Sequence, residues 1–247
     1  MNIAFIPARI GSKRLPRKNI KLLNGIPLIA YAIYSSNMSG EFSQVIVSTD
    51  SEEVAEIAIK WGASVNQLRP SELATDKSAD NEWLQHELKI LSNEILSETD
   101  LIGILRPTNP LRSSNTIRSA VELLTNTPKA DSIRAMQITD KHPGKMWRVN
   151  EDGLAHPYLD QSMEIIPTHN RSTQSLETLW VQNASLEIVR KRSFLDTGSI
   201  SGNSVLGFEM PNYEGFDINT QEDWSYLEYL IHKHPNLLPK IEIGERE

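Results

Sequence analysis

Residues 3–19 read Ile-Ala-Phe-Ile-Pro-Ala-Arg-Ile-Gly-Ser-Lys-Arg-Leu-Pro-Arg-Lys-Asn. The apolar run at 3–7 predicts a buried strand. The loop after it carries five cations: Arg9, Lys13, Arg14, Arg17 and Lys18. Positive charges packed into one loop repel one another, so the arrangement calls for an anion. Gly11 and Ser12 lie among them and allow backbone N–H groups to approach that anion closely. The stretch therefore predicts a polyphosphate-binding loop at the C-terminal end of a central strand.

The alternative is a solvated basic patch or a nucleic-acid-binding segment. Such a patch needs neither the preceding strand nor small residues at fixed places. The two common phosphate loops are also absent. Gly11 has no second glycine before a Lys-Ser/Thr pair, and no G-x-G-x-x-G pattern occurs. We interpret residues 9–19 as a third kind of phosphate loop.

The composition narrows the class of protein. The chain has 247 residues, a net charge of −7 and no cysteine. Its acidity argues against nucleic acid as the main partner. The missing cysteines exclude disulfides, thiolate metal sites and a cysteine nucleophile. There is no apolar run of the roughly 18 residues that a membrane span needs. With no signal-peptide pattern at the N-terminus, we expect a cytoplasmic protein.

Strand and helix signals alternate over the first 140 residues, which predicts an α/β sheet covered on both faces. Ligands of such sheets bind beyond the C-terminal ends of the strands. Ser51 is a suitable N-cap for one of the helices, and Gly62 ends it. Apolar residues spaced from Leu84 to Ile95 predict a third helix, and Thr220 caps a final one. The predicted strands are residues 3–7, 45–48, 101–105 and 132–138.

The pattern changes near residue 140. Residues 140–177 are rich in Pro, His, Asn and Gly and predict an excursion, either a long loop or one containing a hairpin. Regular structure is expected again at 179–189, with a short strand at 208–210. We expect a single domain over residues 1–247 with 140–177 as an inserted arm.

Three further polar segments are expected to meet the loop: residues 68–80, 105–112 and 216–220. On a strand, Asp217 and Asn219 point the same way, and two oxygen ligands on one side suit Mg²⁺ or, as a substitute, Mn²⁺. The alternative is that these two residues merely cap the following helix. Arg69 and Arg106, each followed by proline, are alternatively surface arginines in ordinary turns. The histidines show no metal-binding spacing.

At this point the sequence resembles the acylneuraminate cytidylyltransferases, the CMP-sugar synthetases that couple CTP to a nonulosonic acid such as sialic, legionaminic or pseudaminic acid. Five collinear motifs carry the resemblance over nearly the whole chain. They are residues 6–19 with 27–31, 45–50, 68–74, 106–112 and 217–220.

The resemblance implies a three-layer, Rossmann-like nucleotide-diphospho-sugar transferase fold with a mixed, mostly parallel sheet. It also implies a homodimer whose 140–177 arm reaches toward the partner's site. The implied catalytic residues are Lys18, Lys13, Arg9 and Asp217, and the metal ligands are Asp217 and Asn219. The implied CTP-binding residues are Arg9, Ser12, Lys13, Lys18, Asn19, Arg69, Ser78 and Asp80. Those implied for the sugar are Arg106, Lys145, Gln174 and Asn183.

Three departures from the family pattern concern the metal and the sugar. Asn219 stands where the family usually has a second aspartate, and it brings an oxygen but no charge. Arg106 stands where the sialic acid enzymes commonly have glutamine, and it would suit an additional anion or a different acyl pattern. Residues 171–174 lack an Arg-Gln pair often seen there.

The expected reaction is therefore metal-assisted transfer of CMP from CTP to an acidic 2-keto-3-deoxy sugar, with release of pyrophosphate. Two alternatives remain open. One is a cytidylyltransferase acting on another acid, such as 3-deoxy-manno-octulosonate or a phosphonate. The other, suggested by Asn219, is a CTP-binding module without turnover.

Overall fold

The computed structural model describes residues 1–159 and 166–241, which form two compact units. The first contains residues 1–135 and 183–241, and the second contains residues 136–182. In the sequence, the second unit covers the predicted 140–177 arm and a few residues on each side of it. Residues 160–165 of the arm lie outside the described residues. Among the described residues, no helix is both long and apolar enough to cross a bilayer.

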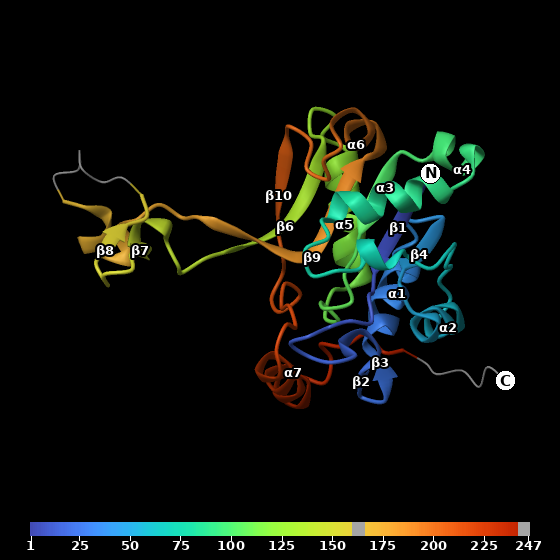
Figure 1. Ribbon diagram of the computed structural model, residues 1–247, viewed down its shortest axis with the longest axis horizontal. Helices are drawn as coiled ribbons and strands as arrows, with labels where there is room; N and C mark the ends of the chain where they lie inside the picture. The colour runs from blue at the N-terminus through green and yellow to red at the C-terminus, as the bar shows by residue number, and fades with distance from the viewer. Residues whose placement is uncertain (160–165, 242–247) are drawn as a thin grey trace. The chain divides into compact units, whose positions relative to one another are not determined.

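A six-stranded sheet organises the first unit, in the order β10-β6-β9-β5-β1-β4 (Figure 1). Strand β1 lies between β4 and β5 and is parallel to both, whereas β9 runs antiparallel to β5. The predicted mixed α/β sheet is confirmed. Its strands are β1 (Asn2–Pro7), β4 (Gln44–Ser48), β5 (Leu101–Ile104), β6 (Ser132–Ile138), β9 (Trp180–Arg190) and β10 (Val205–Glu209).

Alternate side chains of the central strands feed two separate cores. Ala4 and Ile6 of β1 join a core with α1 (Leu28–Ser39), α2 (Glu52–Lys60) and α5 (Ser114–Thr125). Ile3 and Phe5 point to the other face and join a core with α3 (Asp80–Ile90) and α6 (Lys191–Thr197). Because strand side chains alternate, β1 is buried on both faces, which explains why its sequence is continuously apolar.

The helix caps explain where two of these elements begin. The Ser51 side chain accepts a hydrogen bond from the Val54 amide at the start of α2, as predicted. The helix expected over Leu84–Ile95 is wrong as a single element. It ends at Ile90, and Ser92 caps the separate helix α4 (Asn93–Glu98) by accepting from the Ile95 amide. A serine that can serve as an N-cap interrupts the apolar spacing that predicted continuity.

The last helix, α7 (Gln221–Lys233), brings residues 216–220 beside the first loop. Thr220 and Asp223 cap it reciprocally, and Trp224 and Leu227 pack in a third core with Leu28 of α1. The same core receives the hairpin of β2 (Leu22–Leu23) and β3 (Ile26–Pro27), which directly follows the cationic loop. The loop is therefore held between the end of β1 and a hairpin packed against α1 and α7.

The described residues of the second unit contain the antiparallel pair β7 (Trp147–Val149) and β8 (Ala155–Pro157), and three short 3₁₀ turns. Several large apolar side chains of this unit are exposed, among them Trp147, Val149 and Leu154. The 3₁₀ turns are η3 (Pro143–Lys145), η4 (Thr168–Asn170) and η5 (Thr173–Ser175); the first unit adds η1 (Lys18–Ile20) and η2 (Ser71–Leu73).

Gly103 in β5 provides a test of this packing. A Cβ atom there would lie 2.8 Å from Phe42 Cζ, whereas one at Gly11 would meet nothing within 4 Å. We expect Gly103→Ala to lower the free energy of unfolding by about 1–3 kcal/mol through overpacking. Gly11→Ala is the matched control and should stay near the wild type. Urea denaturation of the three proteins checks this, and equal effects of the two substitutions would contradict the packing described.

Candidate functional site

A cleft of about 500 Å³ lies in the first unit, at the C-terminal ends of the parallel strands. It brings together segments that are far apart in the sequence: the cationic loop, residues 69–83, residues 106–108 and Asn219. Its lining residues are Pro7, Arg9, Ser12, Lys13, Arg14, Lys18, Asn19, Arg69, Leu73, Thr75, Asp76, Ser78, Asp80, Trp83, Arg106, Pro107, Thr108 and Asn219. The predicted convergence of the loop with the three polar segments is confirmed.

Backbone hydrogen bonds fix the start of the loop. The Ala8 amide donates to the Ser48 carbonyl at 2.9 Å, and the Ile10 amide donates to Asp50 Oδ1 at 2.9 Å. Further on, Asn19 Nδ2 donates to the Arg9 carbonyl at 2.9 Å, which closes the loop on itself. Asn19 is buried, so here it holds the loop's shape. Together these contacts hold the loop so that Arg9, Lys13, Arg14 and Lys18 line the cleft.

Four of the five cations have acidic or amide partners in the absence of a ligand. Asp76 bridges Arg9 Nη2 at 2.7 Å and Lys13 Nζ at 2.6 Å. Arg14 donates to Asn219 Oδ1 at 2.9 Å. These three contacts provide the counter-charge and hydrogen-bond acceptors that the loop needs. Hydrogen bonds from Lys13 and then Arg9 hold the pKa of Asp76 below its ordinary value.

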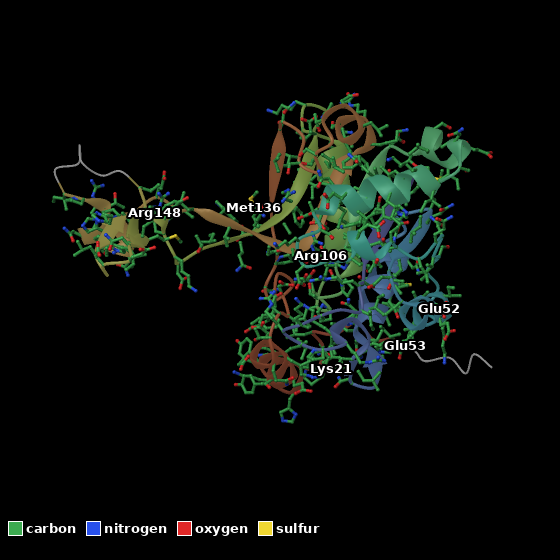
Figure 2. All side chains as sticks on the ribbon, viewed as in Figure 1. Lys21, Glu52, Glu53, Arg106, Met136 and Arg148 are labelled. Carbon is green, nitrogen blue, oxygen red and sulfur yellow. The ribbon has the colours of Figure 1, made fainter. Side chains whose placement is uncertain are left out.

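Arg17 has a different position from the other cations. Its side chain pairs with Glu53 at the start of α2, which is labelled in Figure 2. Its backbone has a φ of 55°, in the left-handed region that a non-glycine residue rarely adopts. This turn leads directly into the 3₁₀ helix that begins at Lys18.

Lys18 is the buried cation of the loop. Its Nζ donates to the Ile218 carbonyl at 2.6 Å. Burial lowers its pKa, and the carboxylate of Asp217 opposes that shift. The loop and the segment before α7 are therefore joined by a hydrogen bond and by an attraction between opposite charges. Lys18, one of the predicted catalytic cations, therefore interacts through its charge with Asp217, a predicted metal ligand.

Asp217 and Asn219 are close together, but the prediction that they lie on a strand is wrong. The Ile218 amide donates to the Thr108 carbonyl, and the Ile218 carbonyl accepts a hydrogen bond from Lys18 Nζ. The backbone groups of Ile218 therefore join no sheet ladder. Asn219 does contribute to capping α7, because its amide donates to Asp223 Oδ2 at 2.8 Å. The capping alternative is thus confirmed for the Asn219 backbone.

The side chains of this pair fit a metal unequally. Asp217 Oδ1 is buried and makes no hydrogen bond, so it is free to accept a cation, whereas Oδ2 accepts from Asn219 Nδ2. The Asn219 oxygen is already taken by Arg14. The described residues contain no group of three or more His, Cys, Asp or Glu side chains arranged to hold a metal. One carboxylate oxygen fits an Mg²⁺ ion that completes its shell with phosphate and water.

Arg69 lies under the cleft and is buried, so the alternative of a surface arginine in a turn is wrong. Its Nε donates to Ser48 Oγ at 2.9 Å, and its guanidinium lies 4.9 Å from the ring centre of Trp83. The Ser48 hydroxyl in turn donates to the buried carboxyl of Glu87. Burial lowers the pKa of Arg69 to about 10, so it stays charged at neutral pH. Arg69 and Trp83 form a rigid cationic and aromatic floor.

Arg106 directly follows the β5 end of the sheet and is labelled in Figure 2. It too is no surface arginine: its side chain is 19% exposed and pairs with Asp80 at 2.7 Å. Burial raises the pKa of Asp80, but the hydrogen bonds and charge of Arg106 outweigh that effect and lower it overall. The guanidinium expected to face an additional anion therefore already has a carboxylate partner.

The remaining predicted residues lie elsewhere or have local partners. Ser78 Oγ donates to the Glu72 carbonyl at the rim of the cleft. Lys145 and Gln174 belong to the second unit, where Lys145 Nζ donates to the Arg171 carbonyl at 2.7 Å. Asn183 is on β9 and accepts a hydrogen bond from the Ser185 amide. Their roles with a sugar stay predictions.

Sequence reasoning assigned no role to Trp83 and Asp76, which line the cleft, or to Glu187, which lies near Arg106. Trp83 follows Asp80 by one helical turn, and that spacing could have identified it. Asp76 belongs to a segment already singled out, and its charge beside five cations was a usable signal. Glu187, which lies within an apolar strand, gave no signal at all.

Comparisons with known proteins identify the family of this chain. A family model described as cytidylyltransferase matches residues 3–198. The CMP-N,N'-diacetyllegionaminic acid synthase of Legionella pneumophila is 35% identical over 232 residues, covering 93% of this chain and 95% of that protein. The N-acylneuraminate cytidylyltransferase of Escherichia coli is 32% identical over 222 residues, covering 90% of this chain and 50% of that protein.

A solved structure agrees in fold. The structure of a CMP:2-keto-3-deoxy-manno-octonic acid synthetase complexed with CTP has a TM-score of 0.67 to this chain at 15% identity, covering 94% of this chain and 99% of that one. At this identity the likeness shows the fold alone. The family model spans most of the sequence, and the Legionella protein matches almost from end to end. The chain therefore belongs to the cytidylyltransferase family of nucleotidyltransferases.

Proposed function

We propose that the protein couples CTP to a nonulosonic acid and releases pyrophosphate and the CMP-sugar. The observation that carries this proposal is the placement of Arg9, Lys13, Arg14 and Lys18 in the cleft lining, with Lys18 in charge contact with Asp217. Asp217 lies outside that lining and keeps one buried carboxylate oxygen without a hydrogen bond. The names of the Legionella and Escherichia coli relatives support a nonulosonic acid as the acceptor.

In the proposed reaction the anomeric hydroxyl oxygen of the acid sugar attacks the α-phosphorus of CTP. A new P–O bond forms, the bond from the α-phosphorus to the bridging oxygen breaks, and pyrophosphate leaves with that oxygen. The hydroxyl proton goes to water, since no side chain of the cleft is an evident general base. Such transfers depend mainly on positioning and on charge stabilisation.

The residues of the loop divide this work. Lys13 and Lys18 neutralise the charge that develops on the leaving pyrophosphate, with Arg9 beside them. Asp76 must give up Arg9 and Lys13 to the phosphates. Asp217 is the residue proposed to hold Mg²⁺, which when bound shields the phosphates and lowers the pKa of the attacking hydroxyl. Asn219 supports Asp217 through its amide group.

Four further expectations have less structural support than the proposed reaction. Use of Mg²⁺, assembly into a homodimer through the 140–177 arm, the cytoplasmic location and the absence of a nucleic-acid partner stay predictions. The exposed apolar side chains of the second unit are what supports the dimer.

The proposed reaction is tested by pyrophosphate release with Mg²⁺, offering each of four nucleoside triphosphates with a panel of acid sugars and phosphonates. We expect release with CTP and an N-acylated nonulosonic acid. Release with CTP and another acid, but with no nonulosonic acid, would mean that the acceptor is that other acid. Tight CTP binding with no release for any acceptor would contradict the reaction and favour a binding module.

Lys18→Ala tests the role of the buried cation. Removing one preorganised charge from the transition state should lower kcat by about 10²–10³-fold. The matched control is Lys21→Ala. Lys21 follows the same loop, but its Nζ lies over Trp224 and near Gln221, outside the cleft lining. Steady-state kinetics with both variants checks this, and wild-type turnover by Lys18→Ala would refute the assignment.

Asn219→Asp tests the metal proposal. A second carboxylate replaces the amide that donates to Asp217, so the two like charges repel until a cation binds between them. We expect a lower Mg²⁺ concentration for half-maximal activity and, without metal, a lower Tm than in the wild type. Metal titration and thermal unfolding with and without Mg²⁺ measure both. An unchanged Mg²⁺ requirement would argue against a metal at this pair.

A further inference from the structure

The Asp80–Arg106 pair is the most completely formed charge contact of the cleft. Arg106 donates through Nη1 to Asp80 Oδ1 at 3.2 Å and through Nη2 to Asp80 Oδ2 at 2.7 Å. Asp80 Oδ1 also accepts from Trp83 Nε1 at 2.9 Å. Two parallel bonds between a guanidinium and a carboxylate fix the orientation of both groups. Arg106 is therefore held in one direction by a residue that also lines the cleft.

Further charges lie behind this pair. Glu187 of β9 is 8% exposed, and its carboxyl group lies 3.6 Å from Arg106 Nη2 and 3.4 Å from Arg134 Nη1. Two guanidinium groups thus face two carboxyl groups, and of these four residues Arg106 and Asp80 line the cleft. The loop, by contrast, carries five cations and has the positive excess that a triphosphate needs.

The Asp80–Arg106 pair lies where the acceptor should approach. Burial lowers the pKa of Arg106, but the carboxylate of Asp80 more than offsets it, and Glu187 and Asp217 raise it further. Arg106 and Lys18 therefore both interact with the charge of Asp217. In phosphoryl-type transfer the attacking and leaving oxygens lie roughly in line through the phosphorus. If pyrophosphate leaves over the loop, the acceptor approaches from the side of Arg106.

We propose that Asp80 determines acceptor specificity by neutralising Arg106, so that this pair selects an uncharged hydrogen-bonding substituent, such as an acyl amide or a hydroxyl, over a second anion. This inference rests on the proposed function. A second anion here would meet the carboxylate of Asp80, and Arg106 is already paired with that carboxylate and lies near Glu187. An amide carbonyl or hydroxyl oxygen gains an oriented guanidinium without that repulsion.

Two acceptors of matched size test the proposal: nonulosonic acids in which the N-acetyl group is replaced by N-oxamoyl, which is neutral, or by N-oxalyl, which is anionic. The wild type should prefer the neutral form in kcat/KM. Asp80→Asn frees the charge of Arg106 and should shift that ratio about tenfold toward the anion. Glu82→Gln is the control, because Glu82 is an exposed carboxylate on the same helix outside the cleft lining. The ratio of the kcat/KM values for the two acceptors does not depend on the fraction of the enzyme that is folded.

A double-mutant cycle with the N-acetyl parent gives a second readout. Asp80→Asn and Arg106→Met should each raise the acceptor KM about tenfold, and the double variant should be no worse than either, because the residues act as one unit. The resemblance implied a CTP contact for Asp80, whereas this inference assigns Asp80 to the acceptor, so the CTP KM should stay unchanged.

An unchanged oxalyl-to-oxamoyl ratio in Asp80→Asn, additive costs in the cycle, or an effect confined to the CTP KM would overturn the inference while leaving the proposed function intact. If the wild type failed to release pyrophosphate with every acceptor offered, the proposed function would fail and the inference with it. Those two failures are therefore distinguishable in the wild-type control.

Discussion

Mutual repulsion among the cations of residues 9–18 is the constraint on which the rest of the site depends. The fold meets it by anchoring the loop rigidly and by surrounding it with acceptors. Hydrogen bonds from Ala8 and Ile10 to the β4 end fix its start, and Asn19 fixes its end. Asp76 and Asn219 then partner the exposed cations, and Asp217 lies close enough to Lys18 to act on its charge. The cost of gathering these charges is offset before any ligand arrives, and a triphosphate can replace Asp76 on Arg9 and Lys13 without rebuilding the loop.

The same constraint explains the difference between the two ends of the cleft. At the loop, cations outnumber the acids that partner them, which suits a highly charged nucleotide. Around Arg106, guanidinium and carboxyl groups balance, which suits an acceptor with few charges. Asp217 lies within electrostatic reach of both ends. This asymmetry suits a transferase that moves CMP from a triphosphate to a sugar, because an equally cationic acceptor site would also attract phosphate.

Much of the fold and of the phosphate end could be predicted from the sequence. The apolar runs of β1, β4, β5 and β6 and the caps Ser51 and Thr220 are local signals, and local signals fix element type and position. The order of the loop and the polar segments along strand ends was enough to predict that Lys18, Arg69 and Arg106 would meet. The break at Ser92 was missed because apolar spacing continues across it.

Side-chain partners could not be predicted in the same way. That Arg106 pairs with Asp80 depends on how α3 is placed beside the end of β5, and no local pattern encodes that placement. Asp217 and Asn219 lie close together although they are not on the predicted strand. Hydrogen bonds from Ile218 to Thr108 and from Lys18 to Ile218 hold residues 217–219 in place instead. Glu187 lies in a strand whose apolar neighbours conceal it.

The most direct test of the central claim is a crystal structure with CTP and Mg²⁺ in the absence of acceptor. The account predicts the triphosphate on Arg9, Lys13 and Lys18, with Asp76 released from its two cations and the metal on Asp217 Oδ1. A triphosphate bound elsewhere, or Asp76 still bridging Arg9 and Lys13 beside bound CTP, would contradict it.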